Sequence, residues 1–397
     1  MRLLIANGRL VDGKGNITEN AWVAIKDQKI EKVGSGDIHE KFKNYSLLDA
    51  AAKTVLPGLI DSHVHIALTG GDPEAERLRS RDMILLEAAA NCRRTLFAGI
   101  TTIRDMGSFG CVDISLRDAI ERKFIIGPRI ICSGRAICIT GGHGWMLGAR
   151  EADGVEEVRK AVREQLKAGI DNLKIMASGG FITKGVNPIH SQFSLDELKV
   201  AVEEARKAGR TIAAHSHPAQ STKDCVIAGI DSIQHGTYAD DEAIRMMVEK
   251  GASLSPTLIT GKHTSENLDL IPEWLAEKVK DVVPIHHQNM AKAYQAGVKI
   301  VMGSDAGSPL LYHGKINLKE LNELVSIGMT AHEAIQSATS TAAEVLGVEE
   351  STGSVQEGKL ADIIVVDGNP LDDITILEDE RNIRVVIKEG EIIKDSL

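Results

Sequence analysis

VLPGLIDSHVH (residues 55–65) is an aliphatic run that ends in two histidines, His63 and His65. In an extended strand, residues i and i+2 point to the same side. The two imidazoles would therefore converge on one point, as metal ligands must. An H-x-H triplet alone says little, so its place at the end of a strand apolar enough to be buried matters more.

Aliphatic runs and helical stretches alternate through the middle of the chain. Several helical stretches end in a glycine that suits a helix C-terminus, as at Gly169 and Gly251. Eight strands alternating with helices over about 250 residues match a (β/α)8 TIM barrel in number and size. A doubly wound sheet is the alternative, but no G-x-G-x-x-G motif follows a first strand. The predicted strands are 55–65, 100–104, 129–134, 172–176, 211–215, 232–235, 253–257 and 299–303, and the predicted helices are 76–98, 155–168, 195–208, 240–249 and 272–296.

The two ends of the chain differ from the middle. Short apolar runs are divided there by turn residues such as Asn-Gly and Asp-Gly pairs, a pattern typical of hairpins. We therefore predict a small, discontinuous β-sandwich domain built from residues 1–55 and 351–397. The barrel, residues 56–350, would be inserted between its two parts.

Composition indicates which partners to expect. The formal net charge of −10 over 397 residues argues against a nucleic-acid-binding surface. Aromatic residues make up only 3% of the chain, which favours parallel α/β architecture with aliphatic strands. Five cysteines form no C-x-x-C pair and indicate reduced thiols. No signal-peptide pattern and no apolar run of roughly 18 residues is found, so we expect a cytoplasmic protein with no membrane partner.

Four further polar residues end aliphatic strands as the histidine pair does. They are Lys174, His215, His235 and Asp305. The C-terminal ends of barrel strands face the active site, so these side chains would meet the histidine pair there. Each alone is more often structural, but five strands that each deliver a ligand-type residue are hard to explain in that way. Imidazoles combined with a carboxylate suit Zn²⁺ or a similar first-row ion.

On these motifs the chain resembles the amidohydrolase superfamily over nearly its whole length. It is most similar to the branch of imidazolonepropionases and Xaa-Pro dipeptidases, because of the KIMASGG stretch at 174–180 and TGGHG at 140–144. The other matching stretches are 57–65, His215, His235-Gly236, GSDAG at 303–307, 339–346 and GKLAD at 358–362.

The resemblance implies a hydrolase with two divalent metal ions, Zn²⁺ as the expected metal, that cleaves an amide C–N bond. The amine of a buried lysine beside two dications would be neutral and could react with CO₂ to give an anionic bridging carbamate. The implied ligands are His63, His65 and Asp305 for one ion, His215 and His235 for the other, and carboxylated Lys174 as the bridge.

Catalytic roles also follow from the resemblance. A hydroxide bridging the ions would be the nucleophile, and Asp305 would pass its proton to the leaving amine. His143 and Tyr238 would donate hydrogen bonds to the substrate's carbonyl or carboxylate.

The substrate is a small molecule whose identity the sequence leaves open. A dipeptide or an N-acyl amino acid is expected, as for a dipeptidase or carboxypeptidase, and a cyclic amide or lactone is the alternative. Arg150, Lys184 and Lys262 are candidates to bind a substrate carboxylate. We also expect a homo-oligomer.

Two other classes of protein compete with the two-metal hydrolase. A one-metal deaminase of the superfamily lacks the bridging lysine and commonly has a glutamate three residues after the fifth-strand histidine. Here Lys174 is present and that position is Pro218. An inactive scaffold would have lost ligands, whereas this chain retains every one.

Two weaker candidates lie close to these strand ends. His217, two residues after His215, could face the site on the same pleat or simply lead into Pro218. Arg104 and Asp105, at the end of the second predicted strand, are expected to form a structural ion pair or to support the site from behind its ligands.

Overall fold

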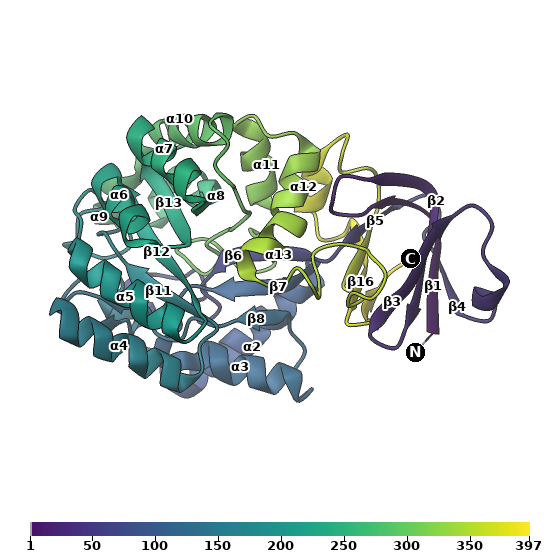
Figure 1. Cartoon of the computed structure of the whole chain (residues 1–397), viewed down its shortest axis with the longest axis horizontal. Helices are drawn as coiled ribbons and strands as arrows, with labels where there is room; N and C mark the ends of the chain where they lie inside the picture. The colour runs from purple at the N-terminus through teal and green to yellow at the C-terminus, as the bar shows by residue number, and fades with distance from the viewer. Residues whose placement is uncertain (1) are drawn as a thin grey trace.

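The computed structural model describes residues 2–397. Figure 1 shows a helix-covered body beside a smaller group of strands, where both ends of the chain lie. That group is one sheet with the order β17-β16-β15-β5-β1-β2-β3, in which β4 also pairs with β1. Its strands are β1 (Arg2–Val11), β2 (Ile17–Lys26), β3 (Lys29–Ser35), β4 (Ser46–Asp49), β5 (Thr54–Pro57), β15 (Ile363–Val366), β16 (Ile383–Lys388) and β17 (Glu391–Asp395).

This terminal sheet joins the two ends of the chain directly. β5 pairs antiparallel with β15, so that Leu56 lies opposite Ile364. The hairpin between β16 and β17 turns at Gly390, whose φ is 75°. A Cβ at this position would lie 1.9 Å from the carbonyl oxygen of Asp27 in the β2–β3 turn, so only glycine allows the two turns to meet. Strands from both ends of the chain thus belong to one sheet, while the β-sandwich domain stays a prediction.

Two parallel sheets form the inside of the helix-covered body. One has the order β6-β7-β8 and the other the order β10-β9-β11-β12-β13-β14. Their strands are β6 (Leu59–Val64), β7 (Ile100–Asp105), β8 (Arg129–Ile131), β9 (Ile137–Cys138), β10 (Arg150–Glu151), β11 (Asn172–Met176), β12 (Thr211–Pro218), β13 (Ser232–Tyr238) and β14 (Ser253–Ser255).

The segment 299–306 connects these two sheets through its backbone. Val301 N donates to the carbonyl of Leu254 in β14 at 2.9 Å, and Ser62 N of β6 donates to the carbonyl of Met302 at 2.9 Å. The segment forms only single bridges rather than a strand ladder. The predicted strand 299–303 is therefore wrong as a strand, although the segment lies between its two predicted neighbours.

Helices surround the parallel sheets (Figure 1). Their ends follow local chemistry: Ser194 and Glu197 form a capping box at the start of α5, and Gly169 ends α4 with a φ of 96°. No helix within residues 2–397 is long and apolar enough to cross a bilayer. The α-helices are α1 (Pro73–Glu76), α2 (Arg81–Phe97), α3 (Val112–Glu121), α4 (Gly154–Ala168), α5 (Leu195–Lys207), α6 (Ala219–Ala228), α7 (Asp241–Lys250), α8 (Leu258–Ser265), α9 (Glu273–Val279), α10 (Val282–Gln295), α11 (Lys319–Ser326), α12 (Ala331–Ser337) and α13 (Ser340–Leu346). Single 3₁₀ turns are η1 (Glu40–Phe42), η2 (Phe109–Cys111), η3 (Trp145–Leu147), η4 (Leu268–Leu270) and η5 (Ile374–Glu378).

Two predicted helices are each divided in the structure. The stretch 76–98 breaks before Ser80, whose hydroxyl accepts a hydrogen bond from Met83 N and starts α2. The stretch 272–296 breaks into α9 and α10, and Pro284 lies in the first turn of α10, where its missing N–H costs nothing. In both cases a helix-start signal inside a long periodic stretch marks the break.

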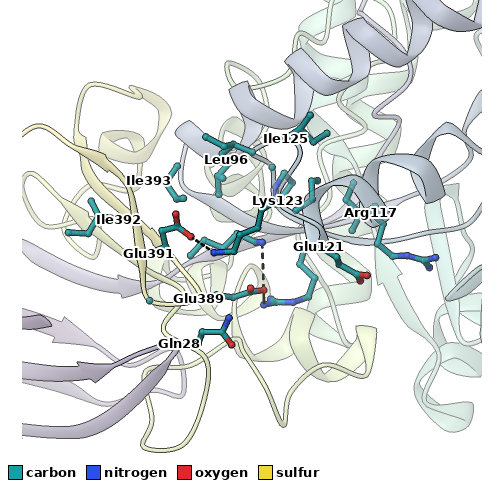
Figure 2. Close-up of a pocket in the computed structure, with 18 of the residues that line it drawn as sticks. Gln28, Leu96, Arg117, Glu121, Lys123, Ile125, Glu389, Glu391, Ile392 and Ile393 are labelled. Atoms are coloured by element: carbon teal, nitrogen blue, oxygen red, sulfur yellow. Dashed lines mark hydrogen bonds and ion pairs between the residues drawn. The ribbon is translucent and has the colours of Figure 1, made fainter. Parts of the chain in front are cut away.

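Charged pairs hold the terminal sheet against the body. Lys123 Nζ lies 3.0 Å from Glu391 Oε2, and Arg129 contacts Glu389 and Asp362 at 2.7 and 2.9 Å. Figure 2 shows the first of these pairs inside a pocket between the two parts. The pocket lies away from the histidines, at the contact between α3, β8 and the β16–β17 hairpin. The ion pairs of this pocket join the two parts of the fold, and the pocket is not the candidate site.

Candidate metal centre

His63 and His65 lie where β6 ends, and Asp305 faces both of them. Asp305 Oδ1 is 3.5 Å from His63 Nε2 and 3.4 Å from His65 Nε2. The Asp305 backbone has a φ of 56° and donates its N–H to the carbonyl of His63 at 2.8 Å. Such a conformation is uncommon outside glycine and clusters at functional sites. The chain thus holds a carboxylate against the predicted histidine pair.

Three more histidines meet on the adjacent strands. Ring nitrogens of His215, His217 and His235 lie within 4.8 Å of one another, and so do ligand atoms of His63, His235 and Asp305. His235 belongs to both groups, so the two groups are contiguous. His217, a weak candidate in the sequence, joins because it is two residues beyond His215 on β12 and therefore on the same pleat.

Hydrogen bonds orient these imidazoles. His63 Nδ1 donates to Gln234 Oε1 at 2.9 Å, and His65 Nδ1 donates to the carbonyl of Gly107 at 3.1 Å. A proton held on Nδ1 leaves the lone pair of Nε2 free for a metal ion. The Nε2 atom of His63 is buried and has no hydrogen-bond partner within residues 2–397. An orphaned, buried nitrogen beside a carboxylate is what a metal site requires.

The histidines are neutral at physiological pH. Burial, followed by the positive charge of Lys174, holds the pKa of His63 well below its usual range and lowers the pKa of His65 to about 4. Burial also holds the pKa of His215 and of His235 well below the usual range. Neutral imidazole is the form that binds a metal ion.

Lys174 is fully buried in the middle of the parallel sheet. It lies in β11 opposite Ala213 of β12 and is 1% exposed. Burial lowers the pKa of its amine, and the nearby carboxylate of Asp305 opposes that shift. The same burial raises the pKa of Asp305. The amine therefore lies among the predicted ligands and is driven toward its neutral, reactive form.

His143 contacts the centre, whereas Tyr238 lies beside it. The His143 ring lies 4.3 Å from the His215 ring at an angle of 31°, and burial lowers its pKa to about 3. A Cβ on Gly180 would lie 2.3 Å from the His143 ring, so this approach requires glycine. The Tyr238 ring packs against the buried cluster of Leu275, Val279 and Val282.

Two further histidines, outside the predicted ligand set, support the ligands from behind. His286 Nε2 donates to the carbonyl of His235 at 3.0 Å, and His313 Nε2 donates to the carbonyl of His65 at 3.2 Å. They come from α10 and from the loop after Asp305. Their distance along the chain from the residues they contact explains why no local motif reveals them.

Arg104 and Asp105 do not form the predicted ion pair. They are neighbours in β7 and point to opposite faces. Arg104 Nε donates to the carbonyl of Ser62 at 2.9 Å, and Asp105 Oδ2 accepts from the N–H of Ile66 at 2.8 Å. Each side chain thus supports the backbone beside the histidine pair, as the second interpretation predicted.

Two of the candidate carboxylate-binding residues are engaged elsewhere. Arg150 contacts Glu164 at 2.7 Å, and Lys262 contacts Glu266 at 3.0 Å. Lys184 is exposed to solvent. None of the three lines either pocket that contains the histidines.

One lysine that the sequence did not reveal fastens the loop over the histidines. Lys278 of α9 donates from its Nζ to four backbone carbonyls, at distances of 3.4, 3.1, 2.7 and 2.7 Å. These carbonyls belong to Gly180, Phe181, Thr183 and Val186, in the loop between β11 and α5. The loop thus gains a charged anchor that comes from a helix almost 100 residues away.

We predict that Lys278→Met loosens this loop. Hydrogen bonds to a charged group contribute about 1.5–3 kcal/mol, so amide hydrogen exchange over residues 180–187 should become at least about ten-fold faster. The exposed neighbour Lys280 provides the matched control, since Lys280→Met leaves the anchor intact. Equal exchange rates in both variants would mean that the four bonds do not hold the loop.

The residues of this centre fit a metal ion. They supply neutral imidazoles, one carboxylate and an orphaned nitrogen, all buried. That donor set suits Zn²⁺ or a similar first-row ion. A histidine-rich group able to bind a metal is therefore present, in agreement with the prediction.

Comparison with known proteins identifies relatives over the whole chain. The ochratoxinase of Aspergillus niger is 34% identical over 426 residues, covering 98% of this chain and 86% of that protein. The crystal structure of a Xaa-Pro dipeptidase with methionine bound in its active site is 36% identical, with a TM-score of 0.90 and coverage of 99% and 100%. The crystal structure of a prolidase complexed with N-methylphosphonate-L-proline is 30% identical, with a TM-score of 0.92 and full coverage of both chains.

The family model described as the amidohydrolase family matches residues 54–393. That range contains every residue of the candidate centre. Together with the relatives, it confirms the resemblance found in the sequence. The chain belongs to the amidohydrolase family and is a hydrolase that acts on carbon–nitrogen bonds.

Proposed function

We propose that this protein is a two-metal hydrolase that cleaves the amide bond of dipeptides or N-acyl amino acids. The observation that carries the proposal is the pair of contiguous ligand groups that share His235. A single ion needs only one such group. Lys174, buried beside Asp305, adds the residue that a bridged pair of ions requires.

The proposal includes the fold around the centre. We propose a (β/α)8 barrel over residues 56–350, with residues 1–55 and 351–397 as a separate β-sandwich domain. The backbone bonds of segment 299–306 to both parallel sheets support closure of the barrel. The mixed terminal sheet supports the second domain. A homo-oligomeric state and a cytoplasmic location stay predictions from the sequence.

Each residue of the centre has a proposed role. Asp305 would accept a proton from the attacking water and deliver it to the leaving amine as the C–N bond breaks. The ions, when bound, supply Lewis-acid polarisation and lower the pKa of water. Their proposed ligands are His63, His65 and Asp305 for one ion, His215 and His235 for the other, and carboxylated Lys174 between them.

His143 and Tyr238 would bind the substrate's carbonyl or carboxylate. The Nδ1 atom of His143 is hydrogen-bonded to Thr183 Oγ1 at 2.9 Å, which fixes the ring against His215. The Tyr238 hydroxyl has no hydrogen-bond partner within residues 2–397, and burial raises its pKa. Both side chains are thus neutral groups able to stabilise a developing negative charge.

Ligands of two relatives favour amino-acid-like substrates. Methionine occupies the active site of the dipeptidase, and N-methylphosphonate-L-proline is bound to the prolidase. Both ligands contain an amino acid, which is the leaving group of a dipeptide or an N-acyl amino acid. The relatives therefore support the dipeptidase proposal over a cyclic amide or lactone.

A substrate screen with a metal count tests this function. Zinc-loaded protein should contain two ions per chain and hydrolyse members of a dipeptide and N-acyl amino acid library. Removal of the metal with a chelator should abolish turnover, and re-addition of Zn²⁺ should restore it. One ion per chain would favour the deaminase class, and turnover of lactones or lactams alone would overturn the proposed substrate.

A further inference from the structure

Two apolar pockets adjoin the candidate centre. The Val279 pocket is lined by Phe181, Leu275, Val279 and Val282 beside His217 and His235. The Met176 pocket is lined by Leu68, Phe109, Leu147 and Met176 beside His65 and His143. Each pocket therefore combines histidines of the centre with several apolar side chains.

Neither pocket is lined by a charged side chain. No Arg, Lys, Asp or Glu occurs among the lining residues of either one. Lys278, which reaches the loop between β11 and α5 from α9, donates its hydrogen bonds to four backbone carbonyls rather than to a pocket. A charged group placed in either pocket would lose its hydration without gaining a partner, which is strongly unfavourable.

One side chain is common to the two pockets. Ile182 lines both of them. It lies in the loop that Lys278 fastens, between Phe181 and Thr183, whose carbonyls both accept hydrogen bonds from Lys278. Thr183 also bonds to His143. Ile182 thus lies in a loop that is held to α9 through Lys278 and to His143 through Thr183.

We propose that the substrate carries an uncharged, apolar group on each side of the scissile amide bond, with one group in the Val279 pocket and the other in the Met176 pocket. This inference rests on the proposed function, because it places the scissile bond at the metal centre between the pockets. It narrows the substrates to dipeptides of two apolar residues, or to N-acyl amino acids in which both the acyl group and the side chain are apolar. Ile182 keeps the two groups apart.

A matched substrate series tests the proposal in the zinc-loaded protein. Leu-Leu should have a kcat/KM at least about ten-fold higher than Leu-Lys, Leu-Glu, Lys-Leu and Glu-Leu, because a single methylene in an apolar pocket is already worth about 10–200-fold and an unpaired buried charge costs more. Equal rates for charged and apolar side chains on either side of the bond would overturn it.

Two substitutions link each pocket to one side of the bond. V279K and L147K each place a cation in one pocket. One variant should raise kcat/KM for Glu-Leu relative to Leu-Leu, and the other should raise kcat/KM for Leu-Glu relative to Leu-Leu. A change on the same side in both variants would overturn the two-pocket assignment. Should a variant fail to fold, the wild-type series still decides the proposal.

A binding measurement separates this inference from the proposed function. The same dipeptides are titrated calorimetrically into the metal-free protein. Tighter binding of Leu-Leu than of its charged analogues, with no hydrolysis by the zinc-loaded protein, would support the pockets and overturn the proposed activity. Hydrolysis without any preference for apolar side chains would support the proposed activity and overturn the assignment of the two pockets.

Discussion

Replacing Asp305 with asparagine is expected to lower kcat by about 10³-fold, within the range found for general acid–base residues. The carboxylate lies 3.5 and 3.4 Å from the ring nitrogens of His63 and His65. An amide in its place keeps the shape but can neither take the proton nor carry negative charge to an ion. Asparagine also tolerates the left-handed backbone of this position, where φ is 56°. The loss would therefore report chemistry rather than strain.

Ser308→Ala provides the control for this substitution. Ser308 Oγ donates to Asp305 Oδ1 at 3.0 Å, and loss of one hydrogen bond to a charged group costs about 1.5–3 kcal/mol, so Ser308→Ala should lower kcat less than Asp305→Asn does. The measurement is steady-state kcat for both variants on one amide substrate, with the metal content of each determined. If Asp305→Asn stayed within ten-fold of wild type at full metal content, Asp305 could not be the proton carrier.

The residues that meet at the centre were predictable because the fold imposes a rule on strand ends. His63, Lys174, His215 and His235 each lie at or near the end of an aliphatic run that becomes a parallel strand. Parallel neighbours end at the same edge, so their last residues converge. To apply this rule, one needs to know only in which direction each strand runs. It held even for Asp305, where the preceding segment forms no strand ladder.

The parts that were missed depend on helix packing. Lys278 reaches residues 180–186 only because α9 lies over that loop, and the helix-start signal within residues 272–296 does not indicate where α9 packs. His286 and His313 likewise act across long sequence separations. The apolar pockets are built from loops and helices after the strands, whose positions the alternation of strands and helices does not specify.

Lys174→Met is expected to remove most of the bound metal and to lower kcat by at least about 100-fold, since even residues behind the ligands of a metal site are worth 10–100-fold. Methionine fills much of the lysine stem's volume but cannot form a carbamate bridge. It also removes a buried amine, which is costly to bury unless compensated. In the metal-free form the unfolding temperature of the variant should therefore equal or exceed that of the wild type, while bound metal and activity fall, which separates a ligand role from a structural one.

Metal content measured by mass spectrometry, together with kcat and the unfolding temperature, decides this prediction. The surface variant Lys280→Met is the control and should keep all three values. Metal-free wild-type protein should also take up two ions per chain faster when bicarbonate is supplied, because the bridge needs CO₂, whereas Lys174→Met should show no such dependence. Two ions and undiminished turnover in Lys174→Met would rule out Lys174 as the bridge, whereas a single ion per chain in the wild-type protein would rule out the proposed two-metal centre and favour a one-metal deaminase.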